Sequence, residues 1–182
     1  MSNSAAPKPH LGHTGIFVTD IDRMIDFYTK VLGLILTDRG RGISFDTELA
    51  FLSATPEAHH QLAFATGRPK EATFTTVMQT SFMVDKLDDL RTIRARALNN
   101  GATAMRAIDH GNAWSIYFKD PEGSLVEVYL DTPFHVPQPH AEPLDLDNSD
   151  AEILRVTEAA ARKNPGFMLH DDYVRKAARI MG

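Results

Sequence analysis

The sequence predicts an α+β fold in which two βαβββ modules pair to form a concave mixed sheet, with a C-terminal helical extension. Three observations predict this fold. A strand-like stretch near the start of the chain is followed by an amphipathic helix, further strand-like stretches follow that helix, and the whole order then returns. One module alone leaves a sheet face that it cannot bury, so the two modules are expected to pack together.

The first module is expected over about residues 10–67. Its first strand is predicted over Gly12–Thr19, where β-branched and aromatic residues are frequent. Asp20 is a suitable N-cap for the following helix, whose apolar residues recur at helical spacing until Gly33 ends it. The remaining strands are predicted in the stretches LILTDR, ISFDTELAFLSA and HQLAFAT.

The second module, over about residues 76–131, repeats this order. Gln79–Gly101 is predicted to form a strand, a turn and a helix that ends at Asn-Gly. When the two modules are aligned on their strand and helix patterns, Val18 corresponds to Val84 and His13 corresponds to Gln79. A polar residue therefore heads the first strand of each module. The last strands are predicted in the stretches ATAMRAI, WSIYFKD and LVEVYL.

The segments outside the two modules differ in character. Residues 1–9 are predicted to be a flexible tail, and the folded domain is expected over residues 10–135. A Pro-rich connector and two helices are predicted over residues 136–182, and Ser149 with Glu152 forms a capping-box pattern at the first of these helices. The helices could pack on the sheet of their own domain, or they could serve as a lid or a dimer contact.

Composition and charge exclude several classes of function. The 182 residues carry a net charge of −5 and contain no cysteine. An acidic chain without a basic patch is not expected to bind nucleic acid, and apolar runs stay short of the ~18 residues that span a membrane. The absence of cysteine excludes disulfides and thiolate metal sites, and it fits a cytoplasmic protein. The chemistry therefore has to come from histidine, carboxylates, tyrosine or a bound metal.

Two polar residues stand out in otherwise apolar strands. His13 shares a strand face with Phe17, opposite the face that is expected to pack on the helices. Glu127 lies between Val126 and Val128, and a buried unpaired carboxylate is costly unless a cation relieves that cost. Either residue could also have a structural role: His13 as a solvated strand end, and Glu127 in a salt bridge or on an exposed strand face.

The chain resembles the vicinal oxygen chelate superfamily, which includes glyoxalases, bleomycin resistance proteins and extradiol dioxygenases. The resemblance is carried by the stretches HTGIFVTDIDRMIDFYTKVLGL, HHQLAFA and IDHGNAWSIYFKDPEGSLVEVY, in that order. It covers roughly residues 10–138 and is greatest to the one-domain type I extradiol dioxygenases, such as catechol 2,3-dioxygenases and dihydroxybiphenyl dioxygenases.

This resemblance implies roles for several residues. His13 and Glu127 match metal ligands on the concave face of the sheet. His60 matches the histidine that exchanges a proton with the substrate, and Tyr117 matches the tyrosine that hydrogen-bonds a substrate oxygen. His110 lies near the position of a further histidine that supports the site.

The position of Gln79 departs from the extradiol pattern, which has a second histidine ligand there. A glutamine carbonyl oxygen can bind a divalent metal, but it favours a different range of metals from imidazole. Glyoxalase-type members of the superfamily do use glutamine as a ligand. Either Gln79 is the third metal ligand, or His60 is a ligand instead of a base, or metal binding is impaired.

The function implied by the resemblance is that of an Fe(II)-dependent extradiol dioxygenase. Such an oxidoreductase takes a small aromatic diol and O₂ as its partners and serves aromatic catabolism, and we expect a homo-oligomer. Mn(II), Ni(II) and Zn(II) are the alternative metals. Two other functions are open: a glyoxalase- or epimerase-like lyase or isomerase with a non-redox metal, and a metal-free binding protein of the bleomycin-resistance kind. His60 and Tyr117 favour the dioxygenase, whereas Gln79 favours the alternatives.

Overall fold

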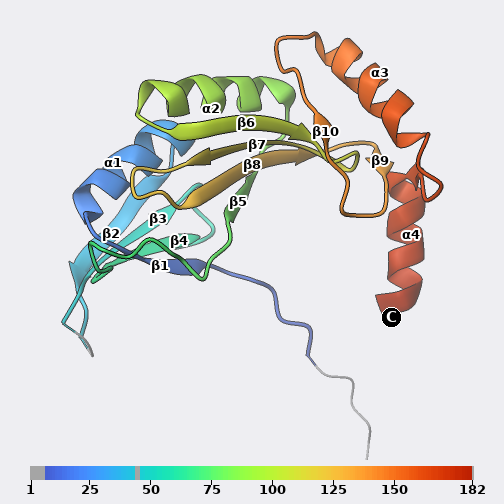
Figure 1. Ribbon diagram of the computed structural model, residues 1–182. Coiled ribbons are helices and arrows are strands. Elements are labelled where there is room, and N and C mark those ends of the chain that lie inside the picture. The colour runs from blue at the N-terminus through green and yellow to red at the C-terminus, as the bar shows by residue number, and fades with distance from the viewer. Residues whose placement is uncertain (1–6, 44–45, 182) are drawn as a thin grey trace, which may run out of the picture. The chain divides into compact units, whose positions relative to one another are not determined.

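The computed structural model describes residues 7–43 and 46–181 and confirms the predicted α+β class (Figure 1). The chain divides into two units, residues 1–72 and residues 73–182, and each unit contains one of the predicted modules. Of the predicted N-terminal tail, residues 1–6 lie outside the described residues, whereas residues 7–9 are exposed and form neither helix nor strand. In the part of the chain that is described, no helix is both long and apolar enough to cross a membrane.

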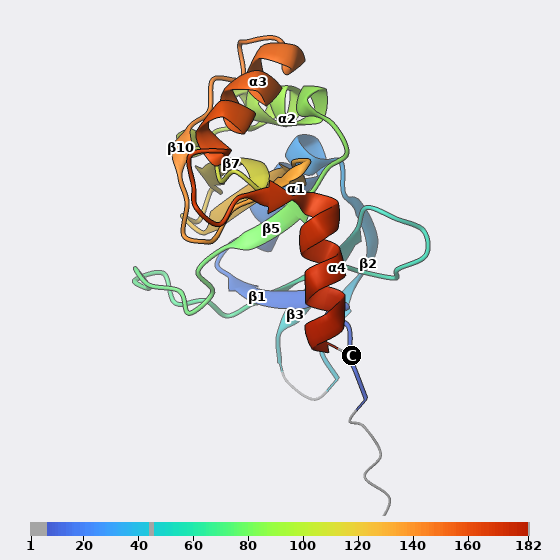
Figure 2. The same cartoon turned by 90° about the vertical axis from the view of Figure 1, so that its right-hand side faces the viewer.

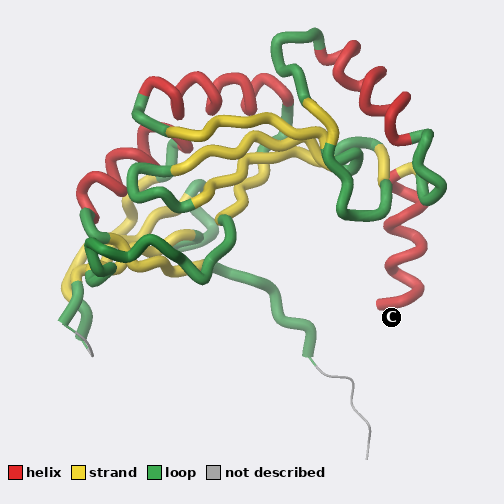
Figure 3. Tube along the Cα trace, viewed as in Figure 1, coloured by secondary structure: helices red, strands yellow, loops and turns green. Residues whose placement is uncertain are grey.

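The first unit has the predicted order of one strand, one helix and three strands. Its sheet has the order β1-β4-β3-β2, in which β1 is parallel to β4 and the other pairs are antiparallel. Figure 3 draws the strands in yellow and the helices in red. The elements are β1 (Thr14–Val18), α1 (Ile21–Leu32), β2 (Ile35–Arg41), β3 (Glu48–Ser53) and β4 (Leu62–Thr66). Several predicted boundaries were wrong. β1 and β4 each begin two residues later than expected, so that His13 and His60 precede their strands, and β3 begins at Glu48 instead of Ile43.

The helix of the first unit begins and ends as its sequence predicts. The side chain of Asp20 accepts a hydrogen bond of 3.0 Å from the backbone N–H of Arg23. Gly33 ends the helix in the left-handed conformation, with φ 72°. The buried face of α1 packs on the sheet, where the rings of Tyr28 and Phe64 lie 5.1 Å apart, centroid to centroid. Phe17 faces away from this core and is 65% exposed.

The second unit repeats the topology of the first. Its sheet has the order β10-β6-β7-β8-β5, in which β10 (Glu142–Pro143) is an added edge strand and β5 is parallel to β8. One face of this sheet is covered by α2 (Figure 1). The repeat elements are β5 (Thr80–Met83), α2 (Leu87–Asn99), β6 (Thr103–Asp109), β7 (Ala113–Lys119) and β8 (Leu125–Asp131). The predicted repeat is therefore present both in the order of elements and in their pairing.

The C-terminal segment belongs to the second unit. Its helices occur where they were predicted, but its three short strands were not predicted. The elements are β9 (Phe134–His135), β10 (Glu142–Pro143), α3 (Asp150–Ala161), β11 (Met168–Leu169) and α4 (His170–Met181). The capping box forms only in part: the hydroxyl of Ser149 accepts from the N–H of Glu152, whose carboxylate binds Arg155 instead.

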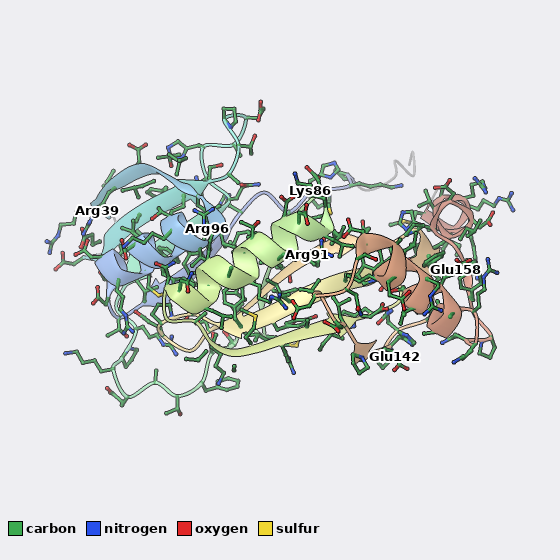
Figure 4. All side chains as sticks on the ribbon, turned by 90° about the horizontal axis from the view of Figure 1, so that it is seen from above. Arg39, Lys86, Arg91, Arg96, Glu142 and Glu158 are labelled. Carbon is green, nitrogen blue, oxygen red and sulfur yellow. The ribbon has the colours of Figure 1, made fainter. Side chains whose placement is uncertain are left out.

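The two C-terminal helices differ in how they are attached. The indole of Trp114 donates to the hydroxyl of Thr157 over 2.7 Å, and that hydroxyl donates to Asp109, so buried polar contacts join α3 to the sheet. Arg91 of α2, which is labelled in Figure 4, forms an ion pair of 2.7 Å with Asp150 at the start of α3. By contrast, α4 has no buried residue and follows β11 directly (Figure 2). Of the alternatives predicted for the C-terminal helices, packing on the sheet of their own domain is therefore observed for α3.

Candidate metal and substrate site

A row of polar side chains crosses the sheet of the second unit. Residues that lie directly opposite each other on neighbouring strands project to the same face. The pairing register therefore places four side chains in one row, and these are Arg106 of β6, Tyr117 of β7, Glu127 of β8 and Ser81 of β5. The flanking residues Ile116 and Val128 point to the other face and are fully buried. The alternation of the strands thus separates a polar face from an apolar core.

Glu127 is the centre of this row and is only 8% exposed. One carboxylate oxygen accepts hydrogen bonds of 2.6 Å from the amide nitrogen of Gln79 and 2.6 Å from the hydroxyl of Ser81, and the other oxygen accepts from the hydroxyl of Tyr117. Among the described residues, no Lys, Arg or His forms an ion pair with Glu127. The interpretation of Glu127 as a partner in a salt bridge is therefore wrong, and its carboxylate is held by neutral donors alone.

This donor set fits a divalent cation. A carboxylate that is held by neutral groups keeps its full charge to attract a metal. Gln79 donates to Glu127 through its nitrogen, and its carbonyl oxygen makes no hydrogen bond within the described part of the chain. The structure thus brings the predicted ligands Gln79 and Glu127 into direct contact.

Tyr117 is held as a neutral phenol. Burial, and next the hydrogen bond and charge of Glu127, raise the pKa of Tyr117 to about 12. Its hydroxyl also lies 2.9 Å from Nε2 of His110. The other nitrogen of that imidazole, Nδ1, lies 2.7 Å from the carbonyl oxygen of His140 and must therefore carry a proton. The hydroxyl of Tyr117 can therefore donate its hydrogen bond either to the carboxylate of Glu127 or to Nε2 of His110.

These residues line a cavity of about 400 Å³ in the second unit. Its volume suits a small aromatic molecule. The lining residues are His110, Asn112, Ala113, Tyr117, Glu127, Tyr129, Asp131 and Gln138. Three residues predicted from the sequence, His110, Tyr117 and Glu127, therefore share one pocket.

One wall of this cavity comes from the connector that follows the second module. The amide nitrogen of Gln138 donates to the carbonyl oxygen of His110 over 2.8 Å and to the side-chain oxygen of Asn112 over 3.0 Å. The carbonyl of His140 fixes the proton of His110, as described above. Sequence reasoning missed Gln138 and Asn112, because no periodic pattern marks residues whose role depends on where a loop folds back.

In the first unit, the structure brings His13 and His60 together. Each residue shortly precedes a strand, and β1 and β4 pair in parallel with Thr14 opposite Leu62. Parallel pairing aligns the starts of the two strands, so the two imidazole rings lie 4.3 Å apart, centroid to centroid. His13 is exposed, whereas His60 is half-buried and its ring contacts that of Phe51.

His60 is connected to a carboxylate through the preceding histidine. Nε2 of His59 lies 2.7 Å from the carboxylate of Asp38, and Nδ1 of His59 lies 2.9 Å from Nδ1 of His60. Because a carboxylate can only accept, Nε2 of His59 carries the proton, so its Nδ1 accepts from Nδ1–H of His60. Burial, followed by the neighbouring imidazoles of His13 and His59, lowers the pKa of His60. His60 is therefore a neutral imidazole whose Nε2 is free to act as a base.

The predicted metal donors thus form two sets, one in each unit. His13 lies with His60 in the first unit, and Gln79 lies with Glu127 in the second. Over the residues that the structure describes, no three His, Cys, Asp or Glu side chains gather in a group that could hold a metal. Neither set alone supplies the three ligands that a catalytic metal usually has.

The fold and these polar sets define a protein of two repeated βαβββ modules, with polar donors at the strand starts of one and a carboxylate-centred pocket in the other. Residues 10–128 match the model of the Glyoxalase/Bleomycin resistance protein/Dioxygenase superfamily. The chain therefore belongs to this superfamily, the vicinal oxygen chelate proteins, and the resemblance inferred from the sequence is confirmed.

Relatives in this superfamily catalyse different reactions. Biphenyl-2,3-diol 1,2-dioxygenase 2 of Rhodococcus globerulus is 26% identical over 127 residues, which cover 68% of this chain and 63% of the relative. The chain thus spans less than two thirds of the length of that dioxygenase. Lactoylglutathione lyase of Escherichia coli O157:H7 is 29% identical over 122 residues, which cover 64% of this chain and 88% of the lyase. Superfamily membership alone does not determine the reaction.

Solved structures show the same fold. A glyoxylase/bleomycin resistance protein/dioxygenase domain from Frankia sp. EAN1pec superposes with a TM-score of 0.59 at 22% identity, over 69% of this chain and 100% of that chain. The fosfomycin resistance protein FosX from Mesorhizobium loti superposes with a TM-score of 0.54 at 20% identity, over 69% of this chain and 94% of that chain. At these identities the likeness extends to the fold alone.

Proposed function

We propose that this protein is a metal-dependent extradiol dioxygenase that opens the ring of a catechol-type substrate with O₂. The observation that carries the proposal is the environment of Tyr117, a neutral phenol between Glu127 and His110 in a cavity large enough for one aromatic ring. A diol oxygen bound beside Glu127 would receive a hydrogen bond from this phenol. The relationship to the biphenyl-2,3-diol dioxygenases adds support.

We further propose His13, Gln79 and Glu127 as the metal ligands. The buried charge of Glu127 and the available carbonyl oxygen of Gln79 support a cation in the second unit. Fe(II) is the proposed metal, with Mn(II), Ni(II) and Zn(II) as alternatives. When bound, such an ion would acidify the substrate hydroxyls and activate O₂.

The protein's own residues would move the protons. Nε2 of His60 is the free base nitrogen, and it would accept a proton from a substrate hydroxyl. His59 and Asp38 would keep the other proton of His60 on Nδ1, so the ring would not turn away from the substrate. Tyr117 would stabilise charge on the substrate oxygen, and His110 would in turn orient the hydroxyl of Tyr117.

A lyase or isomerase of the glyoxalase type is the second candidate. The specific observation in its favour is Gln79, a neutral oxygen donor in contact with Glu127, together with the 29% identity to lactoylglutathione lyase. Such an enzyme would use a non-redox metal and would not consume O₂. A metal-free binding protein would instead use the cavity as a simple ligand site.

Anaerobic reconstitution separates these functions. Purified protein is loaded with Fe(II), Mn(II), Ni(II) or Zn(II), desalted, and mixed with a panel of catechols under O₂. Oxygen uptake with a yellow ring-fission product in the iron-loaded sample supports the dioxygenase. Isomerisation of a methylglyoxal–glutathione adduct with nickel or zinc, without oxygen uptake, supports the lyase. If the protein retains none of the metals but binds the catechols, the result supports a metal-free binding protein. Gel filtration of the same samples tests the expected homo-oligomer.

A further inference from the structure

We infer that Arg106 binds an anionic group on the substrate, so that the preferred substrate is an aromatic diol that carries a carboxylate. Arg106 belongs to the polar row and lies directly opposite Tyr117 in the pairing of β6 and β7. Its guanidinium carbon lies 4.9 Å from the centroid of the Tyr117 ring. The cation thus lies against the residue that also contacts Glu127 and His110.

Arg106 is available for a ligand. Its side chain is exposed, and within the described residues it forms no ion pair. Most other arginines of the structure are occupied by carboxylates, among them Arg39, Arg91, Arg94, Arg155, Arg162 and Arg175. A guanidinium that stacks on an aromatic ring is held in place, and it keeps the N–H groups at its edge free for a carboxylate.

The spacing of the strands matches a substrate with two polar ends. Arg106 and Glu127 lie on the same face and are separated by one intervening strand, hence by about 10 Å between their backbones. The carboxylate of Glu127 is held by three neutral donors and, among the described residues, forms no ion pair with Arg106, so the guanidinium stays available for another anion. A ring with hydroxyls toward Glu127 would direct a substituent on its opposite side toward Arg106. The diol part of this inference rests on the proposed function, whereas the anion-binding role does not.

The test is equilibrium binding to the protein without added metal. Isothermal titration compares 3,4-dihydroxybenzoate with catechol, two probes that differ only in the carboxylate. Wild type should bind the carboxylate probe more tightly, and Arg106→Gln should weaken its binding about 10- to 100-fold, as expected for hydrogen bonds to a charged group, with catechol unchanged. Arg106→Lys keeps the positive charge but loses the paired N–H donors of the guanidinium. Its affinity for 3,4-dihydroxybenzoate should therefore lie between those of wild type and Arg106→Gln.

Arg96→Gln is the matched control. Arg96 lies on α2 and not on the polar row of the sheet, and its substitution removes the same charge (Figure 4). It should leave the binding of both probes unchanged. Equal affinity of wild type and Arg106→Gln for 3,4-dihydroxybenzoate, including no measurable binding by either, would overturn the inference. If wild type shows the carboxylate preference but the iron-loaded protein does not open the ring, the proposed reaction is wrong and the role of Arg106 stands.

Discussion

The contact between Tyr117 and Glu127 makes a prediction about stability at alkaline pH. The pKa of Tyr117 is raised from 10.0 to about 12 in the folded protein. Because folding favours the protonated phenol, this group stabilises the folded state fully below pH 10, and the contribution is lost as the pH rises toward 12. Two pH units correspond to at most about 3 kcal/mol of unfolding free energy.

Replacement of Glu127 by Gln should remove part of this effect. The variant keeps the shape of the side chain but loses the charge, so the pKa of Tyr117 should fall below about 12 and, because burial remains, stay above 10.0. Urea unfolding of wild type and Glu127→Gln at several pH values from 9 upward measures the difference. The loss of unfolding free energy above pH 10 should be smaller in the variant.

Tyr117→Phe provides the control for this experiment. Burial, Asp131 and Glu127 also raise the pKa of Tyr129, so Glu127→Gln alters the titration of that tyrosine as well. In the Tyr117→Phe background, Glu127→Gln should therefore change the slope of stability against pH only by this Tyr129 contribution, and the difference between the two backgrounds belongs to Tyr117. If wild type and Glu127→Gln lose stability in parallel between pH 10 and 12, the hydrogen bond between Glu127 and Tyr117 does not determine the pKa, and the reasoning is wrong.

The other predictions concern the proposed metal and base. His13→Ala and Glu127→Ala should each lose metal, measured by elemental analysis, while circular dichroism shows an intact fold; full metal retention by either would exclude that residue as a ligand. His60→Ala should keep its metal and lose about 10²- to 10⁴-fold in turnover, whereas a metal-free variant would make His60 a ligand. Gln79→His should raise the iron-to-protein ratio after identical desalting, since imidazole binds Fe(II) more firmly than a carbonyl oxygen, and an unchanged ratio would show that this position does not coordinate.

The sequence predicts the features of this fold that depend on local pattern. The helix limits at Asp20 and Gly33 follow from capping chemistry, and both occur in the structure. The repeat is visible because each module presents the same alternation and helical spacing, and the alignment of the modules pairs His13 with Gln79. The assignment of these residues and Glu127 as metal ligands came from the resemblance to the superfamily. The beginnings of β1 and β4 were misplaced because a strand ends where its hydrogen-bonded pairing ends, and composition does not show that limit.

Residues whose positions depend on strand register could not be predicted. Arg106 lies opposite Tyr117 because the pairing of β6 and β7 is irregular between Thr103 and Arg106. A shift of one residue would have placed the guanidinium on the other face of the sheet. The contact of Asp38 with His59 likewise joins residues from β2 and from the loop before β4, which no local pattern connects.

The connector over residues 136–140 supplies one wall of the pocket in the second unit. The superfamily match ends at residue 128, yet Tyr129, Asp131 and Gln138 all line the cavity. Tyr129 and Asp131 continue β8, the strand that carries Glu127, whereas Gln138 comes from the connector. Changes within residues 136–140 can therefore reshape one wall of the cavity without altering that strand. Substitution of residues 136–140 is accordingly a direct route to new ring preferences on an unaltered sheet.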